Sequence, residues 1–166
     1  MAIKKIITYP NPILTKNSSK IGDFREYDIN RIITDLKETM LHYNGIGIAA
    51  PQIGMSLRIF LVHTKDGFKE FINPRIIIRS LKKNISEEGC LSIPKVFGLV
   101  KRSNKITIMA YTQHNEKFKL SATGLFARVI QHEMNHLEGI LFIDKATKIT
   151  QGSDELKRYK LFNKKS

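Results

Sequence analysis

The segment Gln131-His132-Glu133-Met134-Asn135-His136-Leu137 contains two histidines four positions apart, with a glutamate beside the first. In a helix, residues four apart lie on nearly the same face, so both imidazoles can reach one metal ion. Two nitrogen ligands and an adjacent carboxylate are typical of a metal-activated hydrolase. The pattern arises by chance in about one chain in a hundred of this composition, so two ordinary helix histidines are the alternative.

Length and composition limit the class of protein. The chain has 166 residues, which predicts a single catalytic domain, 1–166. It has one cysteine, and no stretch approaches the 18 consecutive apolar residues of a membrane-spanning helix. Its first residues lack the apolar run and cleavage site of a secretory signal, so we expect a cytoplasmic, reducing environment.

The net charge of +13 comes from 28 Lys and Arg against 15 Asp and Glu. Such an excess favours polyanionic partners such as RNA, ribosomes or acidic membrane surfaces, although a solvated basic surface explains it equally well. The basic residues are scattered, without the interleaved aromatic residues of single-strand binders. We predict ribosome association through the basic C-terminal helix and tail, residues 151–166, no DNA or membrane partner, and a monomer.

Proline placement and hydrophobic periodicity predict the elements before the motif. Tyr9-Pro10-Asn11-Pro12 excludes a regular helix and predicts an extended arm over residues 1–22. Apolar residues at helical spacing predict a helix that Asp28 caps and Asn44-Gly45 ends. Pro74 is expected to break strand pairing. Strands are predicted at residues 57–64, 70–73, 75–81, 105–111 and 117–120, the last two as an antiparallel hairpin.

The motif itself is expected on a helix that runs through the interior. Leu125 and Val129 fall on the same helical stripe as His132 and His136, and most of the remaining girth is apolar. Two buried histidines on one face need polar partners, and one metal ion supplies a partner for both. The metal-binding interpretation is therefore favoured.

Residues on either side of the motif set the bounds of this helix. Thr123 is the predicted N-cap, and Gly139 is the predicted end. The apolar run at residues 140–143 predicts a strand, and residues 154–162 predict a short helix.

Two histidines hold a metal poorly, because catalytic sites usually have three protein ligands. The third histidine of metzincin proteases would fall at Phe142, which cannot bind a metal. The downstream glutamate of thermolysin-like proteases could correspond to Asp154 or Glu155, but these lie in a charged stretch without a flanking pattern. Cys90 offers a soft thiolate, although a lone cysteine is more often a small buried apolar residue.

Three segments in order resemble the signature motifs of peptide deformylases: Gly45-Ile46-Gly47-Ile48-Ala49-Ala50-Pro51-Gln52, Glu88-Gly89-Cys90-Leu91-Ser92, and Gln131-His132-Glu133-Met134-Asn135-His136. The resemblance extends over nearly the whole chain, and His132 follows Cys90 by 42 positions. It implies an α+β fold, in which antiparallel and mixed sheets surround the central helix. It also implies a metal-dependent hydrolase that removes the formyl group from the N-terminal formylmethionine of nascent polypeptides.

The resemblance implies roles for individual residues. Cys90, His132 and His136 correspond to the metal ligands, and Glu133 to the general base and acid. Gln52 and the backbone N–H of Leu91 would hydrogen-bond the formyl oxygen as charge develops. The metal is expected to be Fe²⁺, for which Zn²⁺, Ni²⁺ or Co²⁺ can substitute.

The substrate is expected to bind as an added strand. The backbone around Ile46 and Gly47, and that before Gly89, would pair with it. The methionine side chain needs an apolar pocket, and helical geometry places Leu125 and Val129 in its wall.

One position departs from the family pattern. Asn135 stands where the family usually has aspartate, so a basic partner such as Arg102 would be less well neutralised. Two other functions stay open on the residues alone. One is a His-Glu-x-x-His metalloendopeptidase, and the other is a basic ribosome- or RNA-binding protein with a relic metal site.

Overall fold

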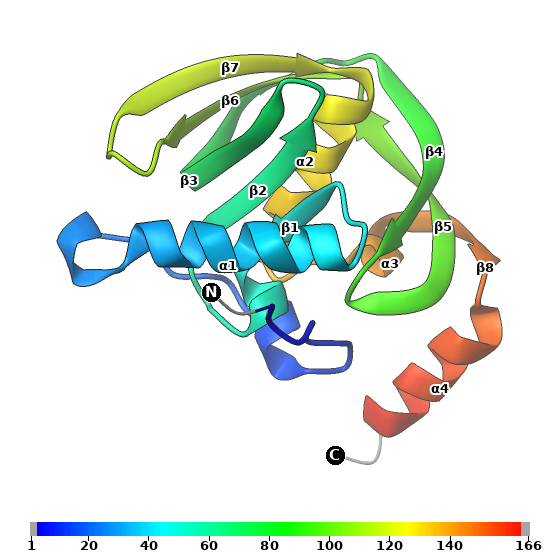
Figure 1. Cartoon of the computed structure of the whole chain (residues 1–166). Coiled ribbons are helices and arrows are strands. Elements are labelled where there is room, and N and C mark those ends of the chain that lie inside the picture. Colours follow the sequence, from blue (N-terminus) through cyan, green and yellow to red (C-terminus); the bar gives the residue numbers. More distant parts are fainter. Residues whose placement is uncertain (1–2, 164–166) are drawn as a thin grey trace.

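The structure, a computed structural model, describes residues 3–163. These residues form an α+β fold with two antiparallel sheets and four α-helices (Figure 1). The helices are α1 (Ile29–His42), α2 (Gly124–Leu137), α3 (Phe142–Lys145) and α4 (Ser153–Asn163). The strands are β1 (Gly47–Ala49), β2 (Ile59–Thr64), β3 (Gly67–Arg79), β4 (Lys83–Cys90), β5 (Ile93–Ser103), β6 (Lys105–Tyr111), β7 (Lys117–Thr123) and β8 (Ala146–Gln151). Short 3₁₀ turns occupy Pro12–Thr15, Phe24–Glu26 and Ala50–Ile53.

The two sheets enclose the motif helix. Within the described residues, one sheet has the strand order β1-β2-β3-β6-β7, and the other has the order β4-β5-β8. Helix α2 contacts strands of both sheets, whereas α1 packs against β1 and β2 (Figure 1). The central helix therefore packs between strands of the two sheets.

Among the described side chains, apolar packing forms three cores around this arrangement. One joins α2 to β2, β3, β6 and β7, and includes Phe60, Phe71 and Ile130. A second packs α1 against the other face of the same sheet through residues such as Leu36. The third joins β5, α3 and α4 to the N-terminal arm, where Leu14 is fully buried. Burial of this kind is the main stabilising contribution to a fold of this size.

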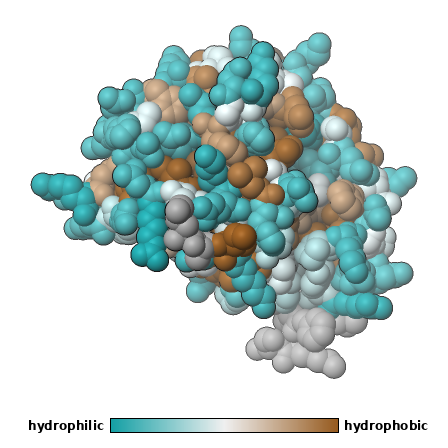
Figure 2. All heavy atoms as spheres, in the orientation of Figure 1, coloured by the Kyte–Doolittle hydropathy of each residue, from teal (hydrophilic) through white to brown (hydrophobic). Residues whose placement is uncertain are grey.

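The surface is largely hydrophilic. Figure 2 shows hydrophilic side chains over most of one face of the molecule, with apolar side chains gathered in patches between them. Across residues 3–163, no helix is both long and apolar enough to span a bilayer.

Several predicted elements are confirmed. Helix α1 begins after Asp28, whose carboxylate accepts the N–H of Arg31 at 3.0 Å. Strands β6 and β7 form the predicted antiparallel hairpin. Helix α2 lies where the motif predicted it, and Gly139 follows it with a φ of +66°, a conformation that favours glycine. Thr123 is its N-cap residue, but its side chain makes no capping hydrogen bond.

Two local predictions are wrong. Pro74 does not end the pairing, because β3 continues to Arg79. The proline lies in a bulge between Ile72 and Arg75, where the register of β3 against β6 shifts. The apolar run at residues 140–143 is not a strand, because Phe142 begins the short helix α3. Asp144 caps the N-terminus of that helix, because its carboxylate accepts the N–H of Leu141 at 2.9 Å. Strands β4, β5 and β8 were not predicted.

Candidate metal centre

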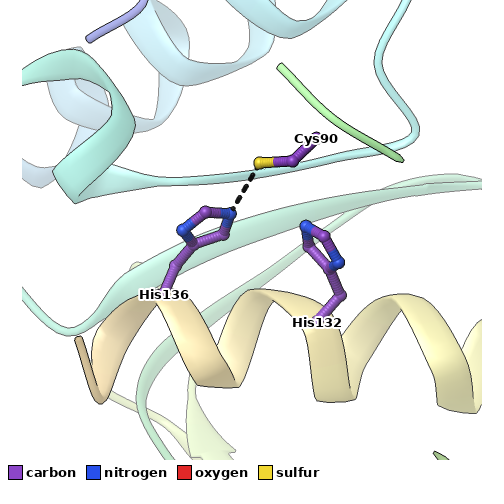
Figure 3. A group of neighbouring side chains, drawn as sticks. All are labelled: Cys90, His132 and His136. Carbon is purple, nitrogen blue, oxygen red and sulfur yellow. Dashed lines mark hydrogen bonds between the residues drawn. The ribbon is translucent and has the colours of Figure 1, made fainter. Parts of the chain in front are cut away.

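Three potential metal ligands converge from two elements (Figure 3). His132 and His136 project from the same face of α2, one turn apart, and Cys90 stands opposite them at the end of β4. The Cys90 sulfur lies 3.2 Å from His136 Nε2. The ligand atoms of the three residues all lie within 4.8 Å of one another, so one ion can reach all three.

The chemistry of this donor set fits a divalent transition metal. One thiolate and two imidazoles suit Fe²⁺, Zn²⁺, Ni²⁺ or Co²⁺, whereas Mg²⁺ and Ca²⁺ prefer oxygen ligands. Burial raises the pKa of the Cys90 thiol to about 12, and the nearby Glu133 charge adds to the effect. Burial also lowers the pKa of His136. Without an ion, the pocket therefore holds a neutral thiol and a neutral imidazole, and binding a cation would release the thiol proton.

Glu88 orients the first histidine. Its Oε2 atom lies 3.0 Å from His132 Nδ1, which leaves Nε2 to face the site. Burial alone would raise the pKa of Glu88, but hydrogen bonds from Arg102 and His132 hold it well below its usual range. Glu88 is therefore a carboxylate that fixes the tautomer and direction of the His132 ring.

Two buried arginines hold Glu88 in turn. Arg102 donates from Nε to Oε1 at 2.9 Å and from Nη2 to Oε2 at 2.8 Å. Arg128 donates to Oε1 at 2.6 Å. Arg102 also donates to the side-chain oxygen of Asn135, which confirms the expected contact at this unusual position. Because Asn135 is neutral, one carboxylate faces two guanidinium groups in this network.

Gln52 points an amide N–H toward the thiol. Its side-chain oxygen accepts the N–H of Ala49 at 2.8 Å, and this bond fixes the amide orientation. Its Nε2 atom donates to Ser92 Oγ at 3.2 Å and lies 3.6 Å from the Cys90 sulfur. Only 2% of Gln52 is exposed, so its amide is held by these contacts and not by bulk water. Its N–H donor therefore has a fixed direction, toward the metal centre.

Glu133 is buried beside the site. Burial, reinforced by the Glu88 charge, raises its pKa well above the ordinary value. Within residues 3–163, Glu133 Oε2 has no hydrogen-bond partner. Gly47 lies directly against this carboxylate, where any Cβ would collide with Glu133 Oε1 and approach Val129 to 2.8 Å. A buried carboxylate with a free oxygen and a raised pKa is suited to proton transfer.

These groups line one cleft of about 800 Å³. Every residue for which the sequence predicted a role borders it except His136, which lies beneath the surface at 1% exposure. The predicted residues on its wall are Ile46, Gly47, Gln52, Gly89, Cys90, Leu91, Leu125, Val129, His132 and Glu133. The structure therefore brings the predicted residues together, although their individual roles stay predictions.

The sequence did not reveal two residues of the supporting network. Glu88 belongs to the second of the three motifs, but no feature of the sequence predicted that it contacts His132. Arg128 lies in the apolar first half of α2, and no sequence pattern predicted a role for it. Its side chain nevertheless donates to Glu88, 40 residues away in the sequence.

Two imidazoles and a thiol converge on one point at the base of this cleft, beside a buried carboxylate and an oriented amide donor. Together they define a metal-dependent hydrolase. The family model described as polypeptide deformylase matches residues 3–152. The chain belongs to this family and is an enzyme that removes the formyl group from N-formylmethionine.

Individual relatives agree with this assignment. A peptide deformylase from Pseudothermotoga lettingae is 48% identical over 143 residues, which cover 86% of this chain and 82% of that protein. The crystal structure of peptide deformylase from Thermotoga maritima matches with a TM-score of 0.86 at 35% identity, covering 89% of this chain and 99% of that one. A class I type b peptide deformylase from Acinetobacter baumannii with bound Met-Ala-Ser matches with a TM-score of 0.82 at 29% identity, covering 87% and 99%.

Proposed function

We propose that deformylation in this enzyme depends on Cys90, His132 and His136 as the metal ligands, with Fe²⁺ as the native ion and Zn²⁺, Ni²⁺ or Co²⁺ as substitutes. The convergence of the thiol with two imidazoles on one point carries this proposal. When bound there, the ion would supply Lewis acidity and would lower the pKa of a water molecule. Cys90 also distinguishes the site from that of a His-Glu-x-x-His endopeptidase, in which a histidine or a carboxylate supplies the third ligand.

Glu133 moves the proton. Its buried carboxylate, with one oxygen free of hydrogen bonds within the described residues, takes a proton from the attacking water. It then gives that proton to the amine nitrogen as the formyl–nitrogen bond breaks. The raised pKa supports this double role, because burial favours the protonated carboxyl group that Glu133 forms when it accepts the proton from water.

Gln52 and Leu91 stabilise the developing charge. The Gln52 Nε2 donor is already fixed by its bonds to Ser92 and, through Oε1, to Ala49. It therefore needs little reorganisation to donate to the formyl oxygen as that oxygen becomes negative. The backbone N–H of Leu91 is the second donor.

The substrate lies extended in the cleft. Ile46 and Gly47 on one wall and Gly89 on the other offer backbone groups for strand-like pairing. Leu125 and Val129 form the apolar wall that receives the methionine side chain. The Acinetobacter baumannii relative was solved with Met-Ala-Ser bound, which supports a peptide with an N-terminal methionine as the ligand of this chain.

The enzyme is expected to release formate from formyl-Met-Ala-Ser when it is purified anaerobically with Fe²⁺ or Ni²⁺. Cys90→Ala should lose most of its bound metal and nearly all turnover, because the site then has only two protein ligands. Metal analysis of the purified proteins, coupled to a formate assay, measures both quantities. Lack of turnover by the metal-loaded wild type would overturn the function, and full metal content in Cys90→Ala would overturn the ligand set.

We further propose that the chain acts as a monomeric single domain in the cytoplasm, on nascent chains at the ribosome. The basic C-terminal segment is the docking element, although residues 164–166 lie outside the described part. In α4, Lys157 and Arg158 are exposed and pair only weakly with Asp154 and Glu155, so their charges stay available.

Deleting residues 154–166 is expected to weaken ribosome co-sedimentation at low salt, where surface charges are least screened. Charge reversal of Lys157 and Arg158 should act in the same direction. Unchanged co-sedimentation of the truncated enzyme would show that this segment is not the docking element.

A further inference from the structure

The hydrogen-bond network that holds His132 carries an unbalanced charge. Its members Glu88, Arg102, Arg128 and Asn135 are each between 5% and 8% exposed. Both guanidinium groups are charged, because arginine does not lose its proton in proteins. Glu88 accepts three hydrogen bonds from these two groups, which keeps it a carboxylate. Two positive charges therefore face one negative charge, and the buried network has a net positive charge.

The remaining partners of the two arginines are neutral. Arg128 donates to the backbone and side-chain oxygens of Asn84 at 3.1 Å and 2.8 Å, and to a backbone carbonyl of β5 at 2.9 Å. Arg102 donates to the side-chain oxygen of Asn135 and to a backbone carbonyl of α2 at 3.4 Å. Among the described side chains, no second carboxylate lies within ion-pair distance of either guanidinium group. The extra charge is therefore balanced by dipoles alone, in a region that solvent screens weakly.

This network is in direct contact with the metal-binding residues. Glu88 Oε2 lies 3.0 Å from His132 Nδ1, so the network ends one hydrogen bond away from the first imidazole. Asn135 directly precedes His136 on α2, and both side chains are buried. The charge of the network therefore acts on any ion that Cys90, His132 and His136 hold.

The net charge that enters the site depends on the ion. A divalent cation brings two positive charges and displaces the proton of the Cys90 thiol, so the site gains one positive charge. A monovalent cation such as Cu⁺, which also suits a thiolate ligand, displaces the same proton, so the site gains no net charge. Like charges repel strongly where solvent is excluded. The network therefore opposes binding of a divalent cation and leaves binding of a monovalent cation nearly unaffected.

We propose that Asn135 sets the metal selectivity of the site by leaving this buried positive charge in place. Asn135 acts through Arg102 and Glu88, and not as a ligand. An aspartate would have the shape of asparagine and would accept the same hydrogen bond from Arg102, but its charge would neutralise the network. The asparagine therefore weakens the retention of divalent cations without altering the ligands. This inference rests on the ligand set of the proposed function.

Asn135→Asp should bind Zn²⁺ about tenfold more tightly than the wild type, while its affinity for Cu⁺ should stay within about twofold. Both dissociation constants are measured by competition titration with chromophoric chelators, without oxygen and at about pH 8, where free imidazole groups are neutral. A packing defect weakens the binding of both ions, whereas the proposed charge effect strengthens the binding of one. The ratio of the two constants is measured within one protein, so an unfolded fraction does not change it.

Two further variants separate charge from shape. Asn115→Asp adds the same charge in an exposed turn, where water and salt screen it, and should change neither affinity by more than about twofold. Arg128→Gln removes a positive charge from the other side of Glu88 and should raise the affinity for Zn²⁺ relative to that for Cu⁺, as Asn135→Asp does. Unchanged Zn²⁺ affinity in Asn135→Asp, or equal gains for both ions, would overturn the proposal and leave the proposed function intact. Failure of the wild type to bind Zn²⁺ would overturn the ligand set as well.

Discussion

Glu133→Gln is expected to lower the kcat of deformylation by about 10²- to 10⁴-fold, the range typical of a lost general base, while metal content stays unchanged. Glutamine preserves the volume of the side chain between Gly47 and Val129, where an added Cβ already has no room. It cannot accept a proton at the position that the carboxylate occupies. Only 3% of Glu133 is exposed, so bulk water does not replace it easily.

The kcat and KM for formyl-Met-Ala-Ser, together with metal analysis of the same samples, test this expectation. Because the amide removes proton transfer and not binding, KM should change far less than kcat. Glu138→Gln is the control, since Glu138 lies at the C-terminal end of the same helix and outside the cleft. If Glu133→Gln keeps more than about a tenth of the wild-type kcat with full metal, Glu133 is not the general base.

The sequence predicted α1 and α2 because each carries an apolar stripe with a 3.6-residue period and residues that mark its ends. It did not predict β4, since the residues of that strand from Lys83 to Glu87 are exposed and mostly polar. Such an edge strand lacks the alternation that marks a half-buried one. Pro74 and the run at residues 140–143 were misjudged because a bulge and the side chain of Asp144 outweigh local propensity there.

The ligands of the site were easier to predict than the network that supports them. His132 and His136 lie one helical turn apart, and three short motifs in order identified Cys90. The contact between Arg128 and Glu88 joins two elements through the packing of α2 on the β4–β5 sheet. No local pattern contains such a contact, because it depends on the register of β4 against β5.

Glu88→Gln is expected to destabilise the metal-free protein by about 3–5 kcal/mol at pH 7, as removal of one partner from a buried ionic network does. Glu88, Arg102 and Arg128 are each no more than 7% exposed, so the variant leaves two guanidinium groups without their carboxylate. Asn135 cannot compensate, because its amide carries no charge. Urea unfolding with chelator present measures this effect, and Glu116→Gln in an exposed turn is the control, expected to change stability by less than about 0.5 kcal/mol.

The pH dependence separates charge from packing. The folded-state pKa of Glu88 is lowered, so its contribution to stability is fully present above the unfolded-state pKa of about 4.3 and declines as pH falls below that value. The stability difference between wild type and Glu88→Gln should therefore be constant from about pH 7 to pH 5 and shrink at lower pH. A difference that is small at pH 7, or does not change with pH below 4, would mean that the carboxylate charge does not hold the two arginines. His132 loses its charged acceptor in the same variant, so metal affinity should also fall, by about 10- to 100-fold in a competition titration.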